Sequence, residues 1–99
     1  MFGTARKRAK KVGLAFSLTH EWARQRWTGR CELSGIELIP GSGGQCMRSP
    51  SIDRIDPSKG YTPDNCRFVC LALNAMRGNG TDAEMLEILR AAVAFQERT

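Results

Sequence analysis

The stretch SIDRIDPSKGYTPDNCRFVCLALNAM, residues 51–76, has the pattern of two short strands followed by a helix. Isoleucines at 52 and 55 bracket the first strand, and a second apolar run covers 66–69. The segment between them contains two turn signals, because proline presets the backbone for a turn and glycine tolerates positive φ. Residues 71–76 then form a short helical pattern that is followed by glycines. The stretch therefore predicts the order strand, loop, strand, helix.

The N-terminal part of the chain predicts two helices separated by an extended segment. Residues 5–12 have good helix propensity but almost no apolar face, so we expect a frayed helix that becomes ordered when it docks on an acidic partner. In residues 14–18 large apolar side chains alternate with small ones, as in a half-buried strand or an extended segment. Thr19 is then placed to cap a helix that runs to about Trp27.

The C-terminal segment has a specific helix start. Thr81 and Glu84 have the spacing of a capping box, in which each side chain accepts a hydrogen bond from the other residue's backbone. Apolar residues then recur at helical spacing, at positions 85, 88, 89, 92 and 95. We expect this helix, at about 82–97, to pack against the core and to carry no chemistry.

Length and composition indicate one small α+β domain. The chain has 99 residues, of which 41% are hydrophobic and 25% charged, as in ordinary globular proteins. We predict a basic N-terminal arm at 1–12 and one domain at 13–99, with a two-strand-and-helix core at about 50–77. No apolar run reaches the roughly 20 residues of a membrane span, and the run at 12–16 is too short for a signal peptide. A cytoplasmic location is expected.

The basic residues are concentrated near the N-terminus of a chain whose net charge is +5 at pH 7. Residues 1–30 hold eight Lys and Arg against the single acidic Glu21, whereas 31–77 are balanced and 78–99 have a net charge of −2. A basic surface binds polyanions by releasing their counterions. The residues predicted to do so are Arg6, Lys7, Arg8, Lys10 and Lys11; the alternative is a solvated tail.

Four cysteines match the number of ligands in a tetrahedral zinc site. They are Cys31, Cys46, Cys66 and Cys70. No two of them form a Cys-x-x-Cys pair, and disulfides are not expected in the cytoplasm. We interpret them as buried thiols, with a structural Zn²⁺ as the alternative.

Asp53 and Asn74 are small oxygen-bearing side chains among apolar neighbours. Asn74 interrupts an apolar helix, where asparagine is a poor helix former and a buried polar group needs a partner. A helix packed across a hairpin can bring the two residues together. One carboxylate and one amide oxygen suit a hard cation such as Mg²⁺; an ordinary hydrogen bond from Asn74 to the backbone is the alternative.

Residues 51–77 resemble the motif of HNH, or ββα-metal, endonucleases, and more closely a phage and bacterial variant with an Asp-Arg-Ile-Asp signature. The resemblance is carried by residues 51–56, 59–61, 64–65, 69–70 and 74, with a weaker likeness upstream at 16–19 and 30–35. It implies that Asp53 and Asn74 bind Mg²⁺ or Mn²⁺ and that Asn65 braces the loop between the strands. It also implies DNA as the substrate, within a bacterial or phage-infected cell.

Arg54 departs from the family pattern, which usually has a histidine base at this position. Arginine is a hydrogen-bond donor only and cannot take a proton near pH 7. In one account Arg54 binds the scissile phosphate bidentately, and a water acidified by the metal, or deprotonated by His20 or Tyr61, attacks phosphorus. In the other account the site is degenerate.

Two functions follow from these residues. The first is a metal-dependent DNA endonuclease or nickase, in which replacing Asp53 or Asn74 by alanine abolishes cleavage and leaves the fold intact. The alternative is a non-catalytic DNA-binding or structural module of the same fold.

Overall fold

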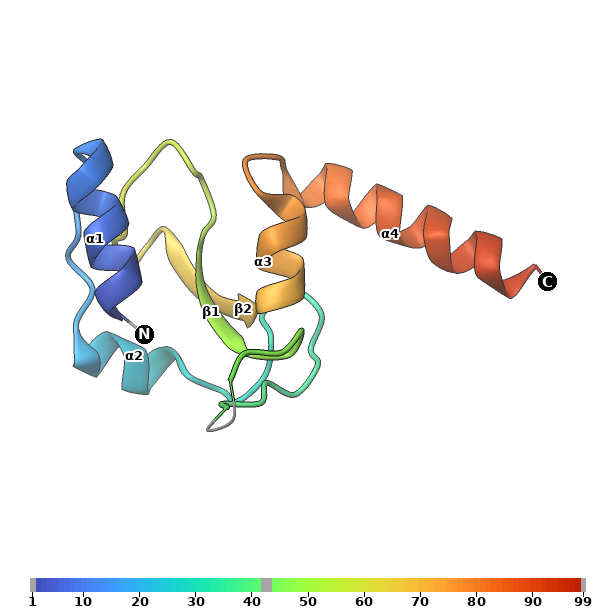
Figure 1. Cartoon of the computed structure of the whole chain (residues 1–99), viewed down its shortest axis with the longest axis horizontal. Coiled ribbons are helices and arrows are strands. Elements are labelled where there is room, and N and C mark those ends of the chain that lie inside the picture. Colours follow the sequence, from blue (N-terminus) through green and yellow to red (C-terminus); the bar gives the residue numbers. More distant parts are fainter. Residues whose placement is uncertain (1, 42–43, 99) are drawn as a thin grey trace.

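Residues 2–41 and 44–98 are described by the structure, a computed structural model (Figure 1). Met1 of the predicted arm, and residues 42, 43 and 99 of the predicted domain, lie outside the described residues. The elements in the described part are α1 (Phe2–Val12), α2 (His20–Arg26), β1 (Pro50–Arg54), β2 (Cys66–Cys70), α3 (Leu71–Arg77) and α4 (Asp82–Glu97).

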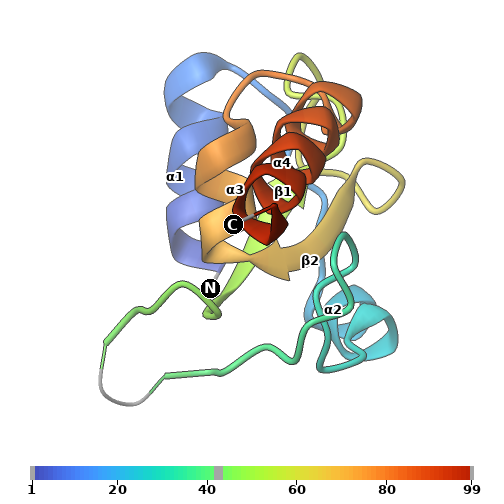
Figure 2. The ribbon, with the colours of Figure 1, turned by 90° about the vertical axis from the view of Figure 1, so that its right-hand side faces the viewer.

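The two strands form an antiparallel hairpin on which α3 packs. Ile52 lies opposite Phe68, and Asp53 lies opposite Arg67. The chain passes from β2 directly into α3, and this helix contacts both strands (Figure 2). The predicted α+β fold, with the order strand, loop, strand, helix, is confirmed.

Phe68 of β2 is the centre of the core on one side of the hairpin. Trp22 stacks on its ring at 5.3 Å between centroids, and Trp27 meets it edge-on at 5.1 Å. Thr19 accepts a hydrogen bond from Trp22 N at 3.0 Å, so α2 begins with the predicted cap. The backbone N–H of Phe68 donates to Glu32 at 2.8 Å, and Glu32 N donates to the Phe68 carbonyl at 2.9 Å. The segment around Glu32 therefore covers one edge of β2.

Helix α1 is not a frayed arm, and that prediction is wrong. Ala5 and Ala9, four residues apart, are buried in the core. Leu14 N donates to the Ala9 carbonyl at 2.8 Å, and the Phe2 ring meets the Phe16 ring at 5.9 Å. Small side chains on one face let the helix backbone approach the core closely, so a narrow alanine face was enough to dock it.

The segment after α1 is extended and pairs with the loop between the strands. Phe16 forms an isolated bridge with Tyr61, and Ser17 N donates to the Tyr61 carbonyl at 2.9 Å. A Cβ atom on Gly60 would lie 2.5 Å from the Ala15 carbonyl oxygen. Glycine at position 60 therefore allows these two segments to approach.

Helix α4 has the predicted capping box but does not pack against the core as expected. Thr81 accepts from Glu84 N at 3.1 Å, and Glu84 accepts from Thr81 N at 3.3 Å. Met85 is its buried residue, whereas Ile88 is 58% exposed and Phe95 is 63% exposed. Only the start of the helix meets the body, so α4 projects away from it (Figure 1). None of the described helices has the length and apolar character to cross a membrane.

Candidate functional site

A groove of about 290 Å³ follows β1 between α1 and α3. Its polar lining comes from Arg8, Ser51, Asp53, Arg54, Tyr61, Asn74, Arg77 and Asn79. A second hollow of about 350 Å³ shares part of this lining and reaches Thr4 and Ala5 of α1. Asp53 and Asn74, which are far apart in the sequence, both line the first of these hollows.

Asp53 is 1% exposed and is held by two guanidinium groups. The hairpin register places Arg67 directly opposite, and its Nε lies 2.9 Å from Asp53 Oδ2. Arg77 reaches the other carboxylate oxygen, Oδ1, from α3. Both oxygens of the candidate metal ligand therefore already accept one charge-assisted hydrogen bond.

Asp82 completes this cluster from the start of α4. Its Oδ1 lies 2.8 Å from Arg67 Nη2 and 3.7 Å from Arg77 Nε, which is buried without a hydrogen bond. Arg77 also donates to the carbonyls of Arg54 and Ile55. Two carboxylates and two guanidiniums thus balance in charge and tie α3 and α4 to the hairpin.

The sequence reasoning missed Arg67, Arg77 and Asp82. A signal for Arg77 was present, because it follows Asn74 by three residues and so lies on the same face of a helix. The partnership of Arg67 with Asp53 depends on the hairpin register, which the long loop between the strands leaves open.

Asn74 donates its amide N–H groups to β1. Nδ2 binds Ser51 Oγ and, more weakly, the Ile52 carbonyl at 3.5 Å. In the described part of the chain no donor is bonded to Asn74 Oδ1. The Asn74 side chain therefore makes the hydrogen bond to the backbone that was the alternative to metal binding, and its amide oxygen is still left without a donor among the described residues.

The donor set fits a hard dication such as Mg²⁺. Asp53 and Asn74 bring a carboxylate and an amide oxygen to the same groove. Each carboxylate oxygen keeps a second lone pair beyond the one that its guanidinium partner occupies. Because Arg67 and Arg77 already offset the Asp53 charge, the ion would fit best together with the negative charge of a phosphate.

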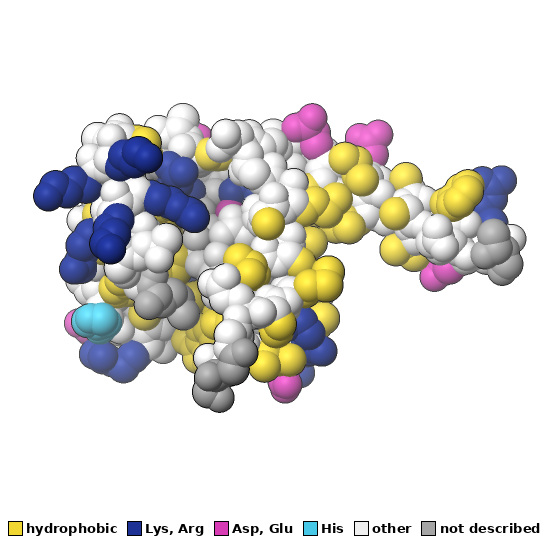
Figure 3. Space-filling model, viewed as in Figure 1, with side chains coloured by type: hydrophobic (Ala, Val, Ile, Leu, Met, Phe, Trp, Pro, Cys, Tyr) yellow, Lys and Arg dark blue, Asp and Glu magenta, His cyan; other side chains and the backbone are white. Residues whose placement is uncertain are grey.

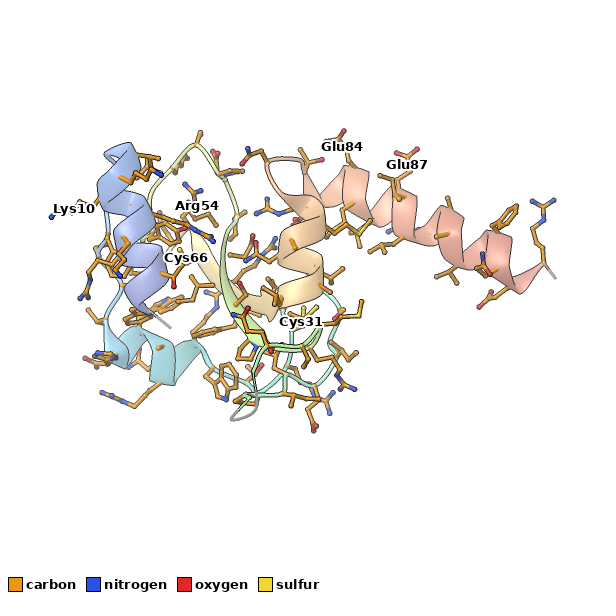
Figure 4. The ribbon with its side chains drawn as sticks, viewed as in Figure 1. Lys10, Cys31, Arg54, Cys66, Glu84 and Glu87 are labelled. Atoms are coloured by element: carbon orange, nitrogen blue, oxygen red, sulfur yellow. The ribbon has the colours of Figure 1, made fainter. Side chains whose placement is uncertain are left out.

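Arg54 lies in the groove with part of its guanidinium committed to the loop (Figure 4). Its Cζ is 4.9 Å from the centre of the Tyr61 ring. Nη1 donates to the carbonyls of Pro57 at 2.8 Å and Lys59 at 3.2 Å. Nε and Nη2 have no hydrogen-bond partner among the described residues, and they form one side of the fork that binds a phosphate bidentately.

Asn65 holds together the loop that orients Arg54. Its Oδ1 accepts from Asp56 N at 2.9 Å, and its Nδ2 donates to the carbonyls of Asp56 at 3.1 Å and Gly60 at 2.9 Å. Asp56 accepts from Ser58 Oγ at 2.6 Å, and this bond lowers the pKa of the Asp56 carboxyl. Asn65 thus acts on the groove through the loop.

His20 is not brought to the groove. Its ring stacks on Phe2 at 5.1 Å between centroids. It lines a separate apolar hollow of about 660 Å³ with Trp27 and Phe68. Of the two residues considered as a base, only Tyr61 lines the groove.

The four cysteines do not form the alternative zinc site; Cys31, Cys66 and Cys70 are buried thiols as interpreted from the sequence, whereas that interpretation is wrong for the exposed Cys46. Cys66 and Cys70 begin and end β2, and four residues of strand span about 13 Å, too far for one ion. Figure 4 shows Cys31 and Cys66 in different parts of the fold. Burial raises the pKa of the Cys66 thiol to about 11. Among the described residues no three His, Cys, Asp or Glu side chains cluster as a metal site.

Basic side chains cover the outside of α1. Arg6, Lys7, Arg8, Lys10 and Lys11 are all exposed, and Figure 3 shows Lys and Arg side chains gathered over this end of the molecule. Arg8 lines the groove, while Arg6 lies 4.9 Å from the Phe16 ring centre. The basic surface and the groove are therefore continuous.

Neither a family model nor a characterised protein sequence matches the chain. The structure is similar to that of the rare-cutting HNH restriction endonuclease PacI, with a TM-score of 0.66 and 23% sequence identity. The match covers 98% of this chain and 78% of that one. At this identity the likeness concerns the fold. The chain therefore has an HNH-like α+β fold, with the hairpin and α3 as its ββα core and the groove beside β1.

Proposed function

We propose that the chain is a metal-dependent DNA endonuclease or nickase that hydrolyses phosphodiester bonds in the groove along β1. One observation carries the proposal: Asp53, Arg54 and Asn74 line a single groove whose rim continues into the basic face of α1. The Asp-Arg-Ile-Asp variant of the HNH motif, acting in a bacterial or phage-infected cell, is the identity that we propose.

Asp53 and Asn74 would hold Mg²⁺ or Mn²⁺. When bound, the ion supplies positive charge that offsets the charge developing at the scissile phosphate. The ion pairs of Asp53 with Arg67 and Arg77 hold the carboxylate in one orientation, so it is preorganised before the substrate binds.

Arg54 would bind the same phosphate through Nε and Nη2. Its Nη1 bonds to the loop fix the guanidinium plane, and Asn65 fixes the loop. The exposed bases of α1 would bind the flanking backbone. Since no imidazole lines the groove in the described residues, the attacking water would release its proton to solvent, to the phosphate or to Tyr61, which does line it, rather than to a histidine.

Incubation of the purified protein with supercoiled plasmid in Mg²⁺, Mn²⁺ or EDTA tests the proposal. We expect nicked plasmid with either cation and intact plasmid in EDTA. Plasmid that stays intact under all three conditions, while binding to DNA is equally strong in EDTA, would instead support a non-catalytic DNA-binding module. Arg54, in the place of the usual histidine, is the observation that favours that second candidate.

The contribution of α1 is tested by substitution, because deleting the helix would uncover the core around Ala5 and Ala9. Lys10→Gln should lower the slope of log K against log salt by about one unit if Lys10 binds a phosphate. Arg90→Gln on α4 removes the same charge far from the groove and should leave the slope unchanged. Equal slopes for Lys10→Gln and the unmodified protein, measured by fluorescence anisotropy, would show that Lys10 is only a solvated charge.

A further inference from the structure

Helix α4 presents an apolar stripe that nothing in the described chain covers. It projects from the body beyond its first turns (Figure 1). Ile88 and Phe95, seven residues apart and so on one face of the helix, are each more than half exposed. Figure 3 shows hydrophobic side chains along the projecting helix, with acidic groups near its start and both basic and acidic groups near its far end.

A lone projecting helix of this kind is expected to need a partner. Helices in proteins are stabilised mainly by packing of their apolar face rather than by helix propensity. Positions 88, 92 and 95 follow the d, a, d spacing of a coiled coil, while Met85, at the preceding a position, is buried against the body. Such a stripe fits another helix with the same spacing.

The charged residues on one flank of α4 are complementary to those on α4 of a second copy when the two helices are antiparallel. In the heptad that places Met85 and Ala92 at a, Glu84 and Arg98 both occupy g positions on one flank. In an antiparallel pair, g positions of the two helices face each other. The register that sets Ile88 opposite Ala92 of a second copy also sets Glu84 opposite Arg98 of that copy, and opposed helix dipoles add to the attraction.

We propose that the chain forms a homodimer through antiparallel pairing of α4 with α4 of a second copy. The pairing rests on the fold and the sequence of α4 and does not require the proposed nuclease activity. With that activity, the dimer would carry two grooves, one for each strand of a duplex.

The expected dimer is weak. A helix of 16 residues is about 24 Å long, and its stripe offers less than the roughly 800 Å² per partner of a standard interface. Dissociation constants on the order of micromolar are therefore expected.

Sedimentation velocity between about 1 and 200 µM, without DNA or divalent cation, tests the pairing; these concentrations bracket the micromolar range above. The mass is expected to rise from 11.0 kDa toward twice that value with concentration. Phe95→Glu should hold the protein as a monomer. Ala94→Glu places the same charge on the opposite face of the helix and should still dimerise. A monomer at every concentration, or equal effects of these two substitutions, would overturn the proposal.

A charge test fixes the antiparallel register. Arg98→Glu should weaken association by placing a second carboxylate opposite Glu84 of the other copy, whereas Arg90→Glu, with the same change of charge on the outer face, should not. Glu84→Gln in the Arg98→Glu background should restore association, because glutamine removes the repulsion and can keep the capping box. Association that does not respond to Arg98→Glu, or binding to neutral lipid vesicles without self-association, would contradict this pairing.

Discussion

Replacing Asp53 by alanine is expected to abolish cleavage and to lower the free energy of unfolding by about 3–5 kcal/mol, because a buried ion pair loses one partner. Arg67 and Arg77 would both lose a carboxylate that is 1% exposed. The substitution is therefore expected to destabilise the fold, contrary to the prediction from the sequence that it leaves the fold intact. Urea unfolding followed by the fluorescence of Trp22 and Trp27 measures the loss.

Asn74→Ala is the matched variant in the same groove. It removes a hydrogen bond to Ser51, which contributes about 1 kcal/mol, so the protein should remain folded while cation-dependent nicking is lost. Cleavage at the unmodified rate by Asn74→Ala would refute its role as a ligand. If Asp53→Ala unfolds at the same urea concentration as Asn74→Ala, the ion-pair cluster is not what stabilises the hairpin.

Arg54→Ala is expected to slow cleavage by about 10²–10³-fold, the usual effect of losing one preorganised donor to a developing negative charge. Arg54→Lys should recover little, because an ammonium group keeps the charge but lacks the planar fork. Single-turnover nicking rates measure both. Since Arg54 also binds the carbonyls of Pro57 and Lys59, the melting temperature of each variant is the control that separates loss of phosphate binding from a loosened loop.

Arg54→His distinguishes the two accounts of this position. Histidine restores the residue usual in the family and can act as a base, so this variant should cut, with a rate that falls below pH of about 6–7 as the imidazole becomes protonated. Equal rates for Arg54→Ala and the unmodified protein would remove Arg54 from the mechanism. An inert unmodified protein with an active Arg54→His variant would establish the site as degenerate.

The hairpin, its helix and the capping signals could be predicted from the sequence because they depend on neighbours in the chain. Turn residues, the Thr81 and Glu84 spacing and the apolar runs act over a few residues, and the structure has each of these elements where its pattern lies. The groove residues Asp53 and Asn74 were found in the same way. Their residue types conflict with apolar surroundings, and a helix folding back on a hairpin brings them together.

What only the tertiary structure decided depends on which surfaces meet. The apolar spacing in the sequence of α4 would be the same in a helix that packs on the core and in one that is exposed. In the structure the turn at 78–80 directs α4 away from the body. The alanine face of α1 is too narrow to stand out in a charged sequence, yet it fits the core closely. Arg67 and Arg77 became partners of Asp53 through the strand register and helix packing, and the same packing left His20 outside the groove. Local sequence determines the helices and strands. Long-range packing determines which side chains share a site, because these side chains are far apart in the chain and no local sequence pattern indicates that they will meet.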